Sequence, residues 1–155
     1  MHGRRSNPTA PTPPDAALCG SPVPVSDLQV LLRDMAPQRQ PGRWRFVAAP
    51  SDGDLGACRP LAVFREPEGT TWLVDDHDAR RLGVEDAPAH AWIMLGVYSD
   101  LQAVGLTAAV SSALAEAGIA CNVVAALHHD HLFVPEAEAA RALEVLQRLA
   151  ATARG

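Results

Sequence analysis

Residues 99–135, SDLQAVGLTAAVSSALAEAGIACNVVAALHHDHLFVP, carry the pattern from which the fold is predicted. Ser99 and Gln102 have the spacing of a capping box, and apolar residues then recur at helical intervals as far as Gly118. Glycine at that point is typical of a helix end. Residues 119–134 continue as two apolar strands separated by a His-His-Asp turn. The stretch therefore predicts a helix followed by a β-hairpin.

The flanks of this stretch extend the pattern in both directions. Residues 91–97 are almost all apolar, as in a buried strand, and Pro135 suits the first position of an amphipathic helix. The second half then runs strand, helix, strand, strand, helix. That order is typical of a ferredoxin-like split βαβ unit that lacks its last strand.

The first half predicts a second, degenerate copy of the same unit. A helix over residues 26–35 with Ser26 as N-cap precedes a strand over 43–49. Residues 61–74 alternate as a hairpin around a Pro/Gly turn, and a short helix follows from the cap Asp75 to Gly83.

The predicted fold class is α+β, with ferredoxin-like βαββαβ units in tandem and antiparallel sheets that carry helices on one face. The predicted divisions are a disordered Pro-rich tail over 1–22, a first unit over 23–88 and a second over 89–152. Neither unit is long enough to bury a good core alone, so we expect two interdependent units.

Composition excludes several function classes. The 155 residues include 13 basic residues, all arginine, so no lysine can form a Schiff base or bind phosphate in a P-loop. A net charge of −5 argues against binding nucleic acid, which needs a basic face. No run of apolar residues follows Arg4 and Arg5 as in a signal peptide, and none is long enough to span a membrane. We expect a cytoplasmic protein.

The chemistry-bearing residues give no catalytic motif. Three cysteines without CxxC spacing predict neither a disulfide framework nor a zinc site, and Cys121 has no base fixed near it. His128 to His131 lack the spacing of known zinc motifs, and adjacent strand residues point to opposite faces, which favours a polar hairpin over a metal site. We therefore predict no metal, no cofactor and no enzyme.

The residues of 99–135 resemble the ACT domain of small bacterial tandem-ACT proteins, and residues 27–37 and 64–74 resemble that family's first half. The resemblance covers roughly residues 25–150. The same kind of ACT pair is similar to the CASTOR-type arginine sensors and to the regulatory part of aspartate kinases. The resemblance implies a regulatory sensor that binds an amino acid or related metabolite at the interface between ACT units.

The predicted ligand site surrounds the helix start at Ser99. Unpaired amides and the positive end of the helix dipole suit a carboxylate there, although Asp100 would repel one placed directly on them. Gly105 leaves room for close approach, and Asn122 is the one strongly polar side chain of its strand. The full set of predicted site residues is Tyr98, Ser99, Asp100, Leu101, Val104, Gly105, Cys121, Asn122, Val123, His129 and Asp130.

Each of these residues also has a purely structural interpretation. Ser99 can serve only as a helix cap, Gly105 can permit tight packing, and Asn122 can bond neighbouring backbone. A competing function is a protein-interaction or homodimer-forming module without a small-molecule ligand, since open sheet edges favour pairing. A metal-dependent enzyme that uses His128 to His131 is a third hypothesis.

Overall fold

The computed structural model describes residues 23–50 and 58–154. The predicted tail and most of the predicted loop over residues 50–60 lie outside these ranges. Within the described part of the chain, no helix combines the length and apolar character needed to cross a bilayer.

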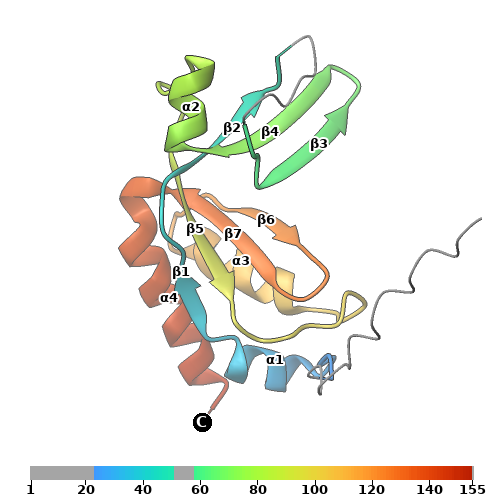
Figure 1. Cartoon of the computed structure of the whole chain (residues 1–155). Coiled ribbons are helices and arrows are strands. Elements are labelled where there is room, and N and C mark those ends of the chain that lie inside the picture. Colours follow the sequence, from blue (N-terminus) through green and yellow to red (C-terminus); the bar gives the residue numbers. More distant parts are fainter. Residues whose placement is uncertain (1–22, 51–57, 155) are drawn as a thin grey trace, which may run out of the picture.

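Within residues 23–50 and 58–154, the chain forms seven strands and four α-helices, whose arrangement is drawn in Figure 1. In chain order they are α1 (Leu28–Asp34), β1 (Pro37–Arg39), β2 (Trp44–Ala48), β3 (Ala62–Glu66), β4 (Gly69–Asp75), α2 (Asp76–Leu82), β5 (His90–Leu95), α3 (Leu106–Glu116), β6 (Asn122–Ala125), β7 (Asp130–Pro135), the 3₁₀ turn η1 (Glu136–Glu138) and α4 (Ala139–Thr152). The strands join into one antiparallel sheet in the order β3-β4-β2-β5-β7-β6, with β1 also on β5.

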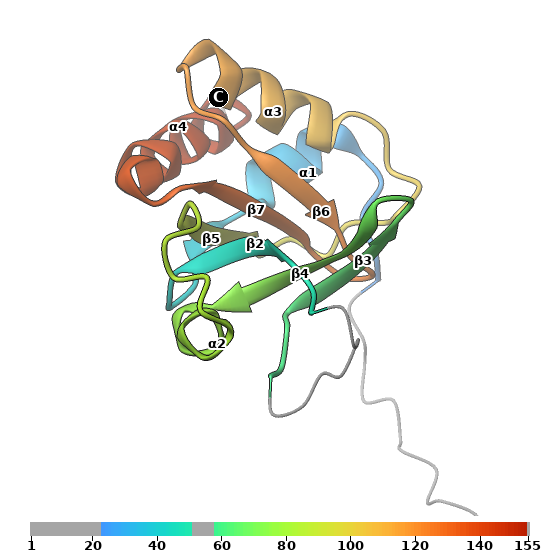
Figure 2. The same ribbon diagram turned by 90° about the horizontal axis from the view of Figure 1, so that it is seen from above.

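The second half forms the larger layer, a sheet with helices on one face. Its strands alternate, so that Ala91, Ile93 and Leu95 of β5 and Leu132 of β7 point toward α3 and α4. These side chains are at most 1% exposed. Figures 1 and 2 show the helices gathered on this side of β5, β7 and β6. The predicted fold class, tandem ferredoxin-like units, is confirmed.

The fourth strand of the second unit comes from the first half of the chain. Strand β1 pairs with β5 in antiparallel register, from Pro37 opposite Leu95 to Arg39 opposite Ile93. The resulting order β1-β5-β7-β6 is that of a complete ferredoxin-like sheet. Helix α1 also packs against the second half, because its Leu31 lies in the core of that half.

One segment, residues 37–48, serves both halves. Its β1 end pairs with β5, and its β2 end pairs with β4, from Trp44 opposite Asp75 to Ala48 opposite Thr71. Between the two ends lies a bulge at Pro41 and Gly42, where Gly42 has a φ of 88°, a left-handed conformation that glycine adopts without strain. The bulge turns the chain from one sheet layer to the other.

The first half is a three-stranded layer, β3-β4-β2, with α2 on one face (Figure 2). Its other face meets the uncovered face of the second half through aromatic side chains. Trp44 meets Trp92 edge-on with ring centroids 5.4 Å apart, and Phe46 meets Phe133 edge-on at 5.6 Å. Such pairs stabilise beyond their buried area.

The predicted N-cap is confirmed for α2 and is wrong for α1. Helix α2 has the predicted cap Asp75, whose side chain accepts a hydrogen bond from the Asp78 amide, and it ends at Gly83 in a left-handed conformation. The predicted N-cap Ser26 of α1 is wrong by one residue. Asp27 caps instead, accepting from the Val30 amide at 2.9 Å, because its carboxylate lies three residues before that amide.

Arg45 is buried, with only 5% of its surface exposed. Strand alternation places it on the same face as Val47, beneath α2. Its guanidinium donates to Asp76 and to the carbonyl oxygens of Glu85 (3.1 Å) and Ala87 (2.9 Å). Burial opposes ionisation of Asp76, but the hydrogen bonds from Arg45 and Arg43 lower the pKa of that carboxyl below its usual value.

Replacing Arg45 with alanine should lower the free energy of unfolding by about 3 kcal/mol, because Asp76 and two carbonyl oxygens lose their buried partner. Arg43 bonds the same carboxylate at 2.7 Å, but half of its side chain is exposed. Arg43→Ala is therefore the matched control, with an expected loss below about 1 kcal/mol. Urea unfolding measures both, and equal losses would contradict the assignment of Arg45 as the buried clamp.

Candidate functional site

The loop between β5 and α3, residues 96–105, is held by the segment that leads into α1 and by the end of that helix. Val25 and Ser99 form a parallel β-bridge, with the Val25 amide donating to Tyr98 at 2.9 Å and the Asp100 amide to Val25 at 3.0 Å. At the start of the loop, the Gly96 amide donates to the carbonyl oxygen of Met35 at 2.7 Å. The loop is therefore a backbone-paired element whose position depends on α1.

The predicted capping box at Ser99 and Gln102 is wrong. Helix α3 begins at Leu106, seven residues beyond Ser99. The bridge to Val25 holds Ser99 in an extended segment, and the Gln102 amide donates instead to the carboxylate of Asp100 at 2.8 Å. Local spacing permits the box, but pairing with a segment 74 residues away decides the conformation.

Gly105 is the N-cap of α3, with a φ of 109°. A Cβ atom there would lie 2.8 Å from Cδ2 of Leu28, closer than atoms in contact can approach. The side chain of Leu28 therefore occupies the space that the sequence left open for a ligand. Of the two interpretations of Gly105, the structure supports close packing.

Four of the predicted site residues line one small cavity at this loop. It has a volume of about 40 Å³ and is lined by Ser99, Asp100, Leu101, Ala103, Leu106, Thr107, Ala125 and Asp130. A second cavity, of about 240 Å³, shares Ser99, Asp100 and Leu101 with it. Strand β7 brings Asp130 to the loop from 31 residues away, and its carboxylate lies 3.4 Å from the Ser99 hydroxyl, which donates to it.

The charge at the cavity is set by Asp130, which is 6% exposed. Burial raises the pKa of its carboxyl above the usual value, while the Ser99 hydroxyl, His131 and His129 act in the opposite direction. Asp100 lines the same cavity, so two acidic groups face one space. The first residues of α3, Leu106 and Thr107, lie at the same place and bring the positive end of the helix dipole.

Three further predicted residues, Tyr98 and Val104 of this loop and His129 of the turn before β7, do not line the small cavity. The ring of Tyr98 contacts the ring of His129 with centroids 6.5 Å apart, and Nδ1 of His129 lies 3.0 Å from the carbonyl oxygen of Val97. Val104 is 84% exposed. Tyr98 also lines the larger cavity.

The other predicted residues, Cys121, Asn122 and Val123, lie at the opposite end of β6 from the cavity-lining Ala125. Asn122 lies three residue steps from Ala125 along the strand, or about 10 Å. Asn122 is exposed, and Val123 packs against the helix-covered core. Burial raises the pKa of the Cys121 thiol to about 11. The structure does not bring these three residues to the loop.

Sequence reasoning missed four residues that line the small cavity: Ala103, Leu106, Thr107 and Ala125. Ala103, Leu106 and Thr107 lie where the sequence predicted the first two turns of the helix, so the error in the helix start concealed them. Ala125 pairs with Asp130 across the hairpin, which only the strand register reveals.

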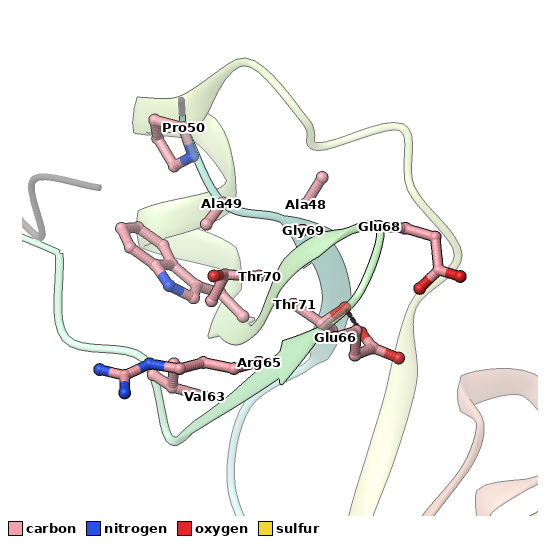
Figure 3. Close-up of a pocket in the computed structure, with 11 residues that line it drawn as sticks. Ala48, Ala49, Pro50, Val63, Arg65, Glu66, Glu68, Gly69, Thr70 and Thr71 are labelled. Carbon is pink, nitrogen blue, oxygen red and sulfur yellow. Dashed lines mark hydrogen bonds between the residues drawn. The ribbon is translucent and has the colours of Figure 1, made fainter. Parts of the chain in front are cut away.

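A wider hollow of about 650 Å³ lies along the β3–β4 hairpin. Figure 3 shows its charged side chains pointing apart, with Arg65 on one side of the hairpin and Glu66 and Glu68 on the other. Glu66 is already bonded to Thr71. These groups do not converge on a common point, so the hollow has no binding chemistry of its own.

Potential metal ligands come together in the first half of the chain, away from the histidine turn. Among the described residues, Asp75, His77 and Asp78 place ligand atoms within 4.8 Å of one another. Asp75 caps α2, and Asp78 accepts from the Arg59 amide at 2.7 Å. Both carboxylates thus have structural partners.

Comparison with known proteins agrees with the observed architecture. The ACT domain matches residues 24–89 and again residues 89–148. A Vibrio cholerae protein of unknown function, described as a possible transport protein, is 41% identical and has a TM-score of 0.70, covering 77% of this chain and 92% of that one. No protein among the curated ones matches.

A more distant structure shares the fold. The α and β subunits of aspartokinase give a TM-score of 0.54 at 14% identity, over 73% of this chain and 95% of that one. The two matches to the ACT domain together span most of the described residues, and the order β1-β5-β7-β6 completes the second one. The chain belongs to the ACT domain family and carries two ACT domains in tandem.

Proposed function

We propose that this protein is a non-catalytic regulatory ACT protein that binds an amino acid or a related amine-bearing metabolite at the loop between β5 and α3. The observation that carries the proposal is one cavity lined both by two carboxylates, Asp100 and Asp130, and by the first residues of α3. An amino acid carries the complementary pair of charges on one carbon atom.

The ammonium and carboxylate groups of an amino acid would bind to different groups around the cavity. A ligand ammonium group is attracted by Asp130 and Asp100, and its hydrogen bonds to ionised oxygens are of the strong, charge-assisted kind. A ligand carboxylate suits the amides at the start of α3, an 11-residue helix. Since α3 begins at Leu106, these amides belong to other residues than Asp100, but Asp100 lines the same cavity and still opposes a carboxylate placed beside it.

The volumes limit what each cavity holds. A space of about 40 Å³ is near the volume of one water molecule, so it accepts a head group such as an ammonium. The neighbouring cavity of about 240 Å³, lined by Tyr98 and Leu127, has room for a side chain. The small cavity is lined by the second half alone, and the larger one adds Pro24 from the segment before α1, within the first ACT match. The larger cavity is therefore lined by residues of both ACT units of this chain.

The non-catalytic proposal is supported by the protonation state of Cys121, the cysteine among the predicted site residues. A thiol with a pKa of about 11 stays protonated at neutral pH and is a poor nucleophile, and Cys121 has such a pKa. ACT domains are typically regulatory and bind ligands, which agrees with this interpretation.

A thermal-shift screen of the twenty amino acids and their decarboxylated amines tests the proposal. A true ligand at about 100 times its Kd adds about 2.7 kcal/mol of stability, or roughly 5–10 °C in Tm. Asp130→Asn should weaken binding about 10- to 100-fold, because it removes the charged acceptor. The matched control is Asp34→Asn, an exposed carboxylate on α1 that should leave the shift unchanged. If no compound raises Tm, the sensor function is refuted.

The affinity of the same ligand should fall as the pH is lowered. Asp130 attracts an ammonium group strongly only while its carboxyl is ionised. Burial raises the pKa of this carboxyl, so it becomes protonated at a higher pH than an ordinary aspartate with a pKa near 3.9. Calorimetry between about pH 4 and 7 should therefore show weaker binding toward acid. In Asp130→Asn the residual binding should lose most of this slope; an unchanged slope would assign it to another group.

A second candidate function, an oligomer-forming module, is favoured by apolar side chains exposed around the same loop. Leu101 is 59% exposed, Leu127 64% and Val104 84%. Exposed apolar groups that cluster are typical of a protein contact.

Val104→Asp tests this alternative, since a charge at the centre of an apolar contact should dissociate a dimer while leaving the monomer folded. Val63→Asp is the control, because Val63 is also exposed but lies on β3, in the first half. Light scattering measures the mass of each variant. A dimer that survives Val104→Asp excludes the loop as its interface.

A further inference from the structure

A further cavity, chemically different from those at the loop, lies between the two halves of the chain. It has a volume of about 240 Å³ and is lined by Leu61, Ala62 and Leu73 of the first half and by Val124, Ala126, His131 and Phe133 of the second. Figures 1 and 2 both show the β3–β4 hairpin beside the β6–β7 pair, and the cavity lies between them. It exists only because the two halves pack together.

The walls of this cavity are fixed by the packing around them. Leu73 is 0% exposed and Phe133 1% exposed, although both line the space. Phe133 is held between Phe46, edge-on at 5.6 Å, and Trp92, stacked at 6.3 Å between centroids. A space between side chains so firmly held is preformed, as small-molecule pockets usually are.

Among the described residues that line this cavity, His131 has the one polar side chain. The indole Nε1 of Trp92 lies 3.0 Å from Nδ1 of His131, and an indole N–H can only donate. Nδ1 must therefore accept, so a neutral ring carries its proton on Nε2. Burial, helped by His129 and opposed by Asp130, lowers the pKa of His131, which favours this neutral form. The ring thus offers one hydrogen-bond donor of fixed identity in an apolar setting.

We propose that this cavity is a separate ligand site for a small, uncharged aromatic molecule that carries one hydrogen-bond acceptor, with the acceptor placed on Nε2–H of His131. An apolar cavity of about 150 Å³ holds benzene, so 240 Å³ accommodates a ring with a short substituent. Phe133 supplies an aromatic wall for such a ring. Charged molecules are disfavoured, because the lining residues in the described part of the chain carry no formal charge when His131 is neutral.

This site is independent of the amino-acid site at the loop between β5 and α3. Asp130 and His131 are adjacent on β7, so their side chains point to opposite faces of the sheet. Asp130 is directed to the loop cavity and His131 to the cavity between the halves. Each site can therefore be removed without its neighbour.

Acetophenone is the probe for the test, because it has an aromatic ring and a single carbonyl acceptor; ethylbenzene has the same shape without the acceptor. The indole N–H of Trp92 bonds directly to the proposed site, so its NMR signal reports binding. In the full chain we expect acetophenone to shift this signal saturably and ethylbenzene to bind about tenfold more weakly. Equal affinities would overturn the role of His131.

Two variants each place a larger side chain in the cavity, one from the first half and one from the second. If one of them fails to fold, the other still tests the proposal. Ala62→Met on β3 and Ala126→Met after β6 should each weaken acetophenone at least tenfold. Ala151→Met, at an exposed position of α4, is the matched control and should bind as the wild type does. Asp130→Asn should leave acetophenone binding intact, which separates this site from the loop site.

Absence of a saturable Trp92 shift at millimolar acetophenone would overturn the proposal. A shift that persists at full affinity in both filling variants would also overturn it, since binding would then occur elsewhere. Neither result bears on amino-acid binding, which is scored separately by the thermal shift and its loss in Asp130→Asn.

Discussion

The fold depends on one shared stretch of backbone, residues 37–48. Its first part completes the second sheet through β1 and β5, and its second part forms the central strand β2 of the first layer. Gln40 bonds to Trp92, and Trp44 lies opposite His90. The shared segment therefore uses four residue steps where β5 uses two, and this bulge turns the chain from one layer to the other. Because both layers share this segment, neither can form its complete sheet without the other.

Two consequences of this sharing reach the candidate sites. Helix α1 precedes β1 and is carried with it into the second half, where Met35 and Val25 fix the loop between β5 and α3. The bulge also folds β2 and its neighbours over the open face of β5 and β7, which brings Phe46 against Phe133 and leaves the cavity beside His131. Both ligand proposals thus concern spaces created by contacts between the two halves of the chain.

Much of the fold follows from local sequence because local signals agree there with the tertiary structure. Asp75 and Gly83 bound α2 as predicted, and the Pro/Gly turn joins β3 to β4. At Ser99 the local signal and the tertiary structure conflict. Ser99 and Gln102 have the spacing of a capping box, but a β-bridge to Val25 holds Ser99 in an extended conformation. The helix therefore begins only after its N-cap Gly105. Of the predicted site, Ser99, Asp100, Leu101 and Asp130 share a cavity, whereas Asn122 lies at the far end of its strand.

The sequence by itself determined the order strand, helix, strand, strand, helix in the second half, the resemblance to two ACT repeats and the buried stripes of α3 and α4, since periodicity, caps and turn residues act over a few residues. Only the tertiary structure decided that β1 supplies the missing strand, that Arg45 is a buried clamp, and that Trp92 sets the proton of His131. Each of these depends on residues more than 30 positions apart. Strand register and layer packing bring such residues together, and no short-range pattern encodes the distance between them.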